Sequence, residues 1–242
     1  MLDNSNKIIL HPLTKHQDDY ICIMNSLIEE NYLKALFSYA NEHGEVSVKE
    51  LSDKLDIKMP TVTSMMKKLS AKGLVKYTSY KPIKLTAIGK KEAGIIIRKH
   101  RLTEMYLVEK MGFGWENVHE IAEQMEHVKS PDLFNRMDEL LDHPKHDPHG
   151  SPIPDKNGKV DWINYPKLSE CKAGDTVRLA AVVNSSAEFL SYLNKRQLQL
   201  DTRMKLLSIE PFDNSMIVSY DNKPSETLSL LVSEKLLVEV IN

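Results

Sequence analysis

Histidines and carboxylates recur at helical spacing in the middle of the chain. Six residues form the pattern: His100, Glu104, His119, Glu123, Glu126 and His127. On an ideal helix the last four fall within an arc of about 100°, and the first two stand about one turn apart on the preceding helix. Imidazole and carboxylate donors without thiolate favour Mn²⁺ or Fe²⁺ over Cu⁺ or a structural Zn²⁺. A solvated, charged helix face would have the same spacing, so spacing alone leaves both interpretations open.

The common signatures of enzymes are missing from the sequence. The segment from His119 to Glu123 begins like the HExxH motif of zinc proteases, but its fifth position is Glu rather than His. A nucleophile elbow, a Walker loop and a dinucleotide-binding fingerprint are also missing. We therefore expect a protein that is not an enzyme and takes no small-molecule substrate. The enzyme alternative, a metal-dependent hydrolase, would need an open coordination position and a substrate cleft.

A second group of potential ligands lies in a stretch rich in proline and glycine. His143, His146 and His149 surround Asp147 there. Loop residues usually lie on the surface, so we interpret these histidines as solvated rather than as metal ligands.

The elements before residue 94 have the pattern of a winged helix. Apolar residues at helical spacing predict a helix over 25–42. Ser47 begins a second helix as an N-cap, with a glutamate three residues later to complete a capping box. Pro60 stands in the first turn of a third helix, which ends at Gly73. Alternating apolar and polar residues over 74–86 then predict a hairpin.

The third helix, residues 58–69, is the expected recognition helix in the major groove. Its hydroxyl residues suit base edges or phosphates, its lysines suit phosphates, and the hairpin lysines would meet the DNA backbone. The expected DNA-contacting residues are Lys58, Pro60, Thr61, Thr63, Ser64, Lys67, Lys68, Lys81 and Lys84.

Charge is distributed unevenly along the chain. The net charge is only -2, but the segment between Asp56 and Glu92 holds nine lysines and no acidic residue. From Arg101 to Asp147, eleven acidic residues stand against five Lys or Arg. A charge run usually marks a solvated face, but a basic window of this length without compensating acids favours phosphate contact.

The rest of the chain predicts a helical segment followed by a β-rich one. Further helices are expected from Thr86 onward, over 116–128 and after Ser130. Apolar-rich runs from residue 177 onward predict about five short strands and a small barrel. The expected fold is mostly α with β, and the expected segments are an N-terminal extension (1–24), a winged helix-turn-helix (25–94), a helical domain (95–160) and a small β-barrel (161–242).

Cysteine usage and hydropathy bear on the compartment. Cys22 and Cys171 are the only cysteines and form no CxxC motif, which is typical of a reducing compartment. The first 20 residues have too short an apolar run for a signal peptide, and no stretch approaches about 18 uninterrupted apolar residues. We expect a cytoplasmic protein that does not cross a membrane.

Four segments resemble the diphtheria-toxin-repressor family of metalloregulators, which includes manganese-dependent members. They are MPTVTSMMKKLSAKGLV (59–75), RKHRLTE (98–104), VHEIAEQMEHV (118–128) and PHGSPIP (148–154). The resemblance implies a homodimeric, metal-activated repressor that binds palindromic operator DNA. It also implies a dimerisation role for the helical domain and an SH3-like (FeoA-type) barrel at the C-terminus.

The same resemblance implies two metal sites. The primary site of the family corresponds to Asn31, Glu123, Glu126 and His127. Its ancillary site corresponds to His100, Glu104 and His119, with Glu188 from the segment 182–193 as a better added donor than Ser185.

Three positions bear on the identity of the metal. Asn31, a weaker neutral donor, stands where family members carry Met or Asp. Lys34 stands where manganese-type members carry a second carboxylate; it cannot be a ligand while protonated, which argues against a two-metal cluster. Glu123 stands where iron-responsive members carry Cys and manganese-responsive members Glu. We therefore expect Mn²⁺, with Fe²⁺ as the alternative and with Zn²⁺, Co²⁺ or Cd²⁺ binding in vitro.

The sequence thus predicts a metal-dependent repressor of metal-homeostasis genes. Two alternatives stay open: an iron-responsive member of the same family, and a winged-helix regulator without a metal switch.

Overall fold

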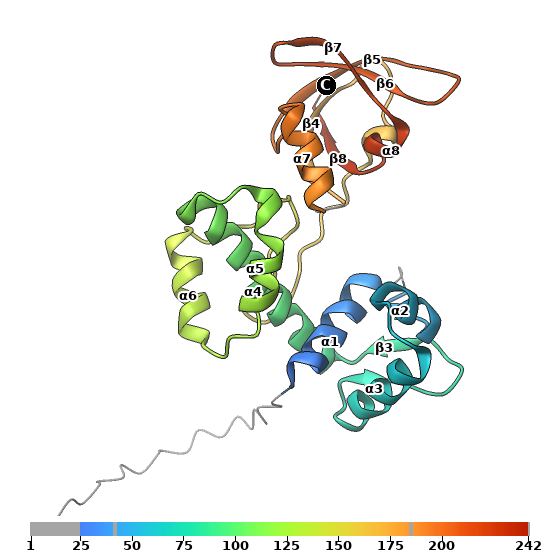
Figure 1. Ribbon diagram of the computed structural model, residues 1–242, viewed down its shortest axis with the longest axis vertical. Helices are drawn as coiled ribbons and strands as arrows, with labels where there is room; N and C mark the ends of the chain where they lie inside the picture. Colours follow the sequence, from blue (N-terminus) through green and yellow to red (C-terminus); the bar gives the residue numbers. More distant parts are fainter. Residues whose placement is uncertain (1–24, 41–42, 184–185, 242) are drawn as a thin grey trace, which may run out of the picture.

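The computed structural model describes residues 25–40, 43–183 and 186–241, which form three lobes (Figure 1). The expected N-terminal extension and Ser185 lie outside the described residues. The lobes follow the chain as a helix-turn-helix unit, a helical unit and a β-rich unit, so the expected fold class is confirmed. Within the described ranges, no helix combines the length and apolar character that crossing a bilayer requires.

The first unit is a winged helix. Its elements are α1 (Leu27–Tyr39), β1 (Glu45–Val46), α2 (Val48–Leu55), α3 (Met59–Ala71), β2 (Val75–Lys76) and β3 (Ile83–Leu85). The predicted capping box of α2 is confirmed, because Ser47 and Glu50 exchange side-chain to backbone hydrogen bonds. The strands form an antiparallel sheet in the order β1-β3-β2. β1 was not expected, since two residues are too few to show a periodic pattern.

The long helix α4 (Ala87–Met111) joins the first unit to the second. Thr86 caps its start, and Gly112 ends it with a φ of 72°. Its first half carries Ala93 and Ile96, which belong to the same buried core as the helices of the winged helix. The boundary expected between residues 94 and 95 therefore falls inside one continuous helix. Any ligand farther along α4 is rigidly connected to the DNA-binding unit.

The helical unit packs shorter helices around the second half of α4. They are η1 (Trp115–Asn117), α5 (His119–Met125) and α6 (Pro131–Leu140). The helix expected over 116–128 is thus interrupted and shorter. Pro131 disfavours helical conformation at the preceding residue, and Ser130 is extended there. α5 itself ends at Met125, so Glu126 and His127 lie in the turn after α5 rather than on one helix face with His119.

The β-rich unit is a five-stranded antiparallel sheet in the order β7-β6-β5-β4-β8 around its own apolar core. Its elements are η2 (Leu168–Glu170), β4 (Thr176–Val182), α7 (Ala187–Lys195), β5 (Arg203–Ile209), β6 (Met216–Tyr220), β7 (Lys223–Leu228), α8 (Leu230–Ser233) and β8 (Leu236–Val240). β7 is a largely exposed edge strand, and therefore it lacks the apolar alternation that marks the other four.

Candidate metal centre

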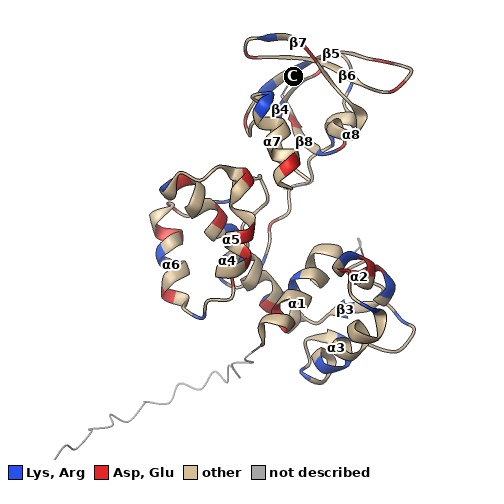
Figure 2. Ribbon diagram, in the orientation of Figure 1, with Lys and Arg blue, Asp and Glu red and all other residues tan. Residues whose placement is uncertain are grey.

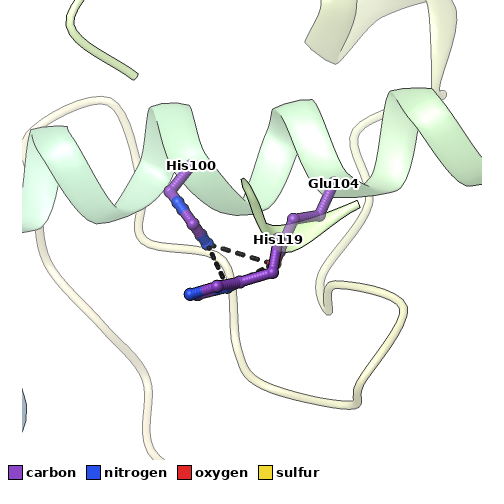
Figure 3. A group of neighbouring side chains, drawn as sticks. All are labelled: His100, Glu104 and His119. Atoms are coloured by element: carbon purple, nitrogen blue, oxygen red, sulfur yellow. Dashed lines mark hydrogen bonds and ion pairs between the residues drawn. The ribbon is translucent and has the colours of Figure 1, made fainter. Parts of the chain in front are cut away.

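His100, Glu104 and His119 form the most compact group of donors. His100 and Glu104 lie one turn apart on α4 and are only 7% and 2% exposed, while His119 comes from the start of α5 (Figure 3). His100 Nε2 lies 3.0 Å from Glu104 Oε1 and 3.2 Å from His119 Nδ1, and the last two atoms are 3.2 Å apart. Neighbouring ligands of an octahedral ion with bonds of about 2.1 Å lie about 3.0 Å apart. The spacing of the three donors therefore suits one divalent cation.

A second group lies on the other side of the His100 ring. His100 Nδ1 donates to Glu126 Oε2 at 2.6 Å, and Glu123 Oε1 lies 3.9 Å from the same nitrogen. Lys34 of α1 reaches into this group, where its ammonium donates to Glu126 Oε2 at 2.7 Å and also to Glu123. The His100 imidazole thus connects the first group, through Glu104, with the second group, through Glu126.

His127 is held by a carboxylate that the sequence analysis did not identify. Its Nδ1 donates to Glu30 Oε2 of α1 at 2.6 Å. In the neutral ring this bond leaves Nε2 unprotonated, and Nε2 lies 3.8 Å from Glu126 Oε1. Glu126 Oε1 is buried and has no hydrogen-bond partner among the described residues. A buried carboxylate oxygen without a partner is costly, so these two donors fit a divalent cation.

Asn31 does not take the inward position on α1. Its side chain is exposed, whereas Glu30 is buried and Lys34, one turn later, is half-buried. One residue rotates the side chain by about 100° around a helix, which separates Asn31 from its inward-facing neighbours. The sequence did contain a signal for the inward position, because the acidic residue Glu30 shares a helix face with Lys34.

Glu188 lies at the start of α7 and is exposed. It is not part of any donor group within the described residues. α7 nevertheless contacts η1, since Trp115 Nε1 donates to Asn194 Oδ1 at 2.7 Å. The β-rich unit is therefore anchored close to the segment that leads into His119.

The expectation that the loop histidines are solvated is wrong for His149. His149 is only 3% exposed, its Nε2 donates to Trp115 O at 2.9 Å, and its Nδ1 lies 3.7 Å from Glu104 Oε2. Asp147 shapes this loop, because its Oδ1 accepts the backbone N–H groups of His149 and Ser151, and it connects the loop to α4, because its Oδ2 lies 3.3 Å from Arg101 Nε. Asp147, His149 and Glu104 form a third group of donors. His143 is exposed, as expected.

Protons and ammonium groups balance the carboxylates of the centre. Burial opposes a charge on His100, but hydrogen bonds to Glu104 and Glu126 outweigh it and raise the pKa of His100 to about 9. Burial also opposes the charge of Glu104, yet its hydrogen bonds with His100, His119 and His149 hold its pKa below the usual range. The pKa of Glu126 is lowered against its burial by His100 and Lys34. A cation that binds to His100 Nε2 must therefore displace a proton.

The expected DNA-contacting residues lie on and beside α3 and on the β2–β3 wing. Eight of the nine are exposed and Thr63 is half-buried. Figure 2 shows lysines along α3 and acidic residues on α5. Two of the lysines have internal partners: Lys68 lies 3.3 Å from Glu29, and Lys84 lies 2.6 Å from Glu45. Tyr80, fully exposed in the wing with a φ of 63°, was not singled out from the sequence.

Comparison with known families covers nearly the whole described chain. Residues 26–83 match the "Iron dependent repressor, N-terminal DNA binding domain", and residues 86–155 match the "Iron dependent repressor, metal binding and dimerisation domain". Residues 167–240 match the FeoA domain. The iron-dependent repressor IdeR of Mycobacterium tuberculosis is 31% identical over 197 residues, which cover 78% of this chain and 83% of that protein. The chain belongs to the iron-dependent (diphtheria-toxin) repressor family.

Solved structures of manganese regulators are similar to this repressor as well. A manganese-dependent transcriptional repressor in complex with manganese has a TM-score of 0.78 and 29% identity, over 88% of this chain and all of that one. The structure of ScaR with bound Cd²⁺ has a TM-score of 0.73 and 33% identity, over 88% of this chain and 99% of that one. The chain is therefore a metal-dependent, DNA-binding transcriptional repressor with DNA-binding, metal-binding and dimerisation domains, and not an enzyme.

Proposed function

We propose that this repressor responds to Mn²⁺ and, when loaded, binds a palindromic operator as a homodimer to control metal-homeostasis genes. The donor set carries the choice of metal. Glu123 supplies a carboxylate, and within the part of the chain that the structure describes the groups around His100 and His127 hold nitrogen and oxygen but no sulfur. Such hard and borderline donors favour Mn²⁺ or Fe²⁺ over softer ions. The similarity to a manganese-bound repressor supports Mn²⁺, and the similarity to IdeR keeps Fe²⁺ as the competing ion.

We assign the primary site to Glu123, Glu126 and His127. From α1, Glu30 would contribute by orienting His127, and Asn31 could contribute directly only if its side chain turned inward. A divalent cation there would supply a strong electrostatic link between the end of α5 and α1. Because α1 packs in the core of the DNA-binding unit, this link would fix the position of α3.

We assign the ancillary site to His100, Glu104 and His119. His100 would coordinate through Nε2 while Nδ1 donates to Glu126, and Glu126 would thereby orient the ring. Glu188 is the proposed donor from the C-terminal domain, and the buried His149 is a competing one. Zn²⁺, Co²⁺ and Cd²⁺ are expected to bind the same donors in vitro.

A metal link between domains supports a simple coupling. With the domains taken as 25–94, 95–160 and 161–242, the cation would restrict the spacing of the two recognition helices in the dimer to one that matches successive major grooves. Coupling of this kind typically contributes about 1–3 kcal/mol, or roughly 5- to 150-fold in DNA affinity.

The identity of the metal is tested by activation of operator binding. Metal-stripped, full-length protein is titrated with Mn²⁺, with Fe²⁺ under anaerobic conditions and with Zn²⁺, and its affinity for its own upstream DNA is measured by fluorescence anisotropy at fixed salt. We expect Mn²⁺ to activate at the lowest free concentration relative to its cellular level. Activation by Fe²⁺ at its cellular level, without activation by Mn²⁺, would make this an iron-responsive repressor instead.

A further inference from the structure

Lys34 occupies a position that is built like a metal site. The donor atoms of His100, Glu123 and Glu126 lie within 4.8 Å of one another. The ammonium of Lys34 bonds to both carboxylates and lies 3.4 Å from His100 Nδ1. It is therefore surrounded by three donors that come from α4, α5 and the turn after α5, none of them on its own helix.

Burial explains why this position needs a permanent cation. The side chain of Glu126 is completely buried, and a buried carboxylate is stable only when it is paired. Its Oε2 receives hydrogen bonds from Lys34 and from His100 Nδ1, whereas its Oε1 faces His127 without a partner. The two oxygens of Glu126 thus face two different cation positions. One position is filled by the chain itself.

We infer that the Lys34 ammonium is a resident cation that replaces a divalent ion between His100, Glu123 and Glu126. The ammonium fills the position and bonds the carboxylate oxygens that a divalent ion would need, so no divalent ion enters this group while Lys34 remains. The inference rests on the proposed metal function of the neighbouring donors. It also gives α1 a link to α5 that does not depend on metal, through the contacts of Lys34 with Glu123 and Glu126.

With Lys34 in the central position, the number of divalent ions that each protomer can bind is limited. Divalent ions are confined to the outer faces of the cluster. The primary ion would bind Glu126 Oε1, His127 and the oxygen of Glu123 that Lys34 does not bond, and the ancillary ion would bind His100 Nε2, Glu104 and His119. The central position is the one in which a second ion would lie about 3.5–4 Å from its neighbour, as in paired metal sites. In the native chain such a pair does not form.

Variants at position 34 test this directly in the full-length protein. Bound Mn²⁺ per protomer is measured by equilibrium dialysis, and the electron paramagnetic resonance spectrum distinguishes isolated ions from exchange-coupled pairs. Lys34→Glu removes the ammonium and adds a carboxylate, whereas Lys34→Gln only removes the charge. Lys34→Arg keeps a cation in place, and Lys156→Glu reverses a charge on an exposed turn as a matched control.

We expect wild type, Lys34→Arg and Lys156→Glu to bind the same number of Mn²⁺ ions, without an exchange-coupled signal. Lys34→Glu should bind one more ion per protomer and show the coupled signal, and Lys34→Gln should bind the extra ion more weakly. A coupled pair in wild type, or no gain in either Lys34→Glu or Lys34→Gln, would overturn the inference and leave the proposed function intact. Mn²⁺ binding to Lys34→Glu but not to wild type would support the inference and contradict the proposed function.

Discussion

Glu30 on α1 accepts a 2.6 Å hydrogen bond from Nδ1 of His127, which lies in the turn after α5. The two residues belong to different units, so this bond joins the DNA-binding unit to the helical unit. It also determines which ring nitrogen of His127 faces Glu126. If His127 binds metal as proposed, the bond would give α1 a role in metal binding even though the exposed Asn31 lies away from the donors.

Glu30→Ala should weaken activation by Mn²⁺ by about 10- to 100-fold, because carboxylates that orient a ligand histidine typically contribute that much to metal affinity. Asn31→Ala, at the exposed neighbouring position, is the matched control and should change the affinity little. Calorimetric Mn²⁺ titrations of both variants provide the measurement. A larger loss in Asn31→Ala than in Glu30→Ala would identify Asn31 as the direct ligand from α1.

His127→Ala and Glu123→Ala should each leave a folded dimer whose operator affinity no longer responds to Mn²⁺. His127 is half-buried at the end of α5 and contributes little to any apolar core, so its removal should affect metal binding more than folding. Light scattering reports the dimer, and DNA binding with and without Mn²⁺ reports the response. A normal metal response in His127→Ala would show that the primary site is assigned incorrectly.

Lys67→Ala should weaken DNA binding at every metal concentration and lower the slope of log affinity against log salt by about 1, since one phosphate contact is lost. Lys68→Ala is the comparison, because Lys68 already lies 3.3 Å from Glu29. We expect a smaller effect for Lys68→Ala. Equal salt slopes for Lys67→Ala and wild type would remove Lys67 from the DNA interface.

The pKa of His100 is raised from 6.5 to about 9, and this shift should determine how the affinity of the ancillary site for Mn²⁺ depends on pH. A raised pKa means that the proton stabilises the folded, metal-free protein below pH 6.5, and this stabilisation is lost as the pH rises through 9. The same proton opposes metal binding at Nε2. Affinity for Mn²⁺ should thus rise roughly tenfold per pH unit between pH 6.5 and 8.5, because one proton is exchanged. An anaerobic titration that gives a constant affinity over this range would exclude His100 as a ligand.

His149→Ala should lower the affinity of the ancillary site for Mn²⁺ if His149 Nδ1 is a donor near Glu104. His143→Ala, at an exposed position of the same loop, should leave the affinity unchanged. A loss of thermal stability in His149→Ala without any change in metal affinity would assign His149 a structural role through its bond to Trp115.

Local patterns were sufficient for the winged helix. The capping box at Ser47, the proline at position 60 and the glycine at position 73 are short-range signals, and each lies at the helix end that it predicts. Spacing also placed His100 and Glu104 one turn apart on a single regular helix, whereas their grouping with His119 came from the family resemblance. The donor atoms of the three residues do lie together.

The remaining features depend on how distant segments pack. On α1 it is Glu30 that faces His127, whereas the resemblance implied its neighbour Asn31. Which of the two residues faces inward depends on how α1 is rotated about its own axis, and that follows from packing. His149 is buried because its loop lies against α4, where Asp147 pairs with Arg101, and loop composition does not encode that contact. The position of Lys34 between two carboxylates likewise follows from the contact of α1 with the helical unit.

Control of DNA binding by metal is tested most directly by comparing the same protein with and without Mn²⁺. Full-length, metal-stripped protein is titrated onto its own upstream DNA at fixed salt, in a chelator and in saturating Mn²⁺, and the two dissociation constants are obtained by fluorescence anisotropy. We predict tighter binding with Mn²⁺ by roughly 5- to 150-fold. Equal affinity in the two conditions would contradict a metal switch and leave a winged-helix protein that binds DNA without one.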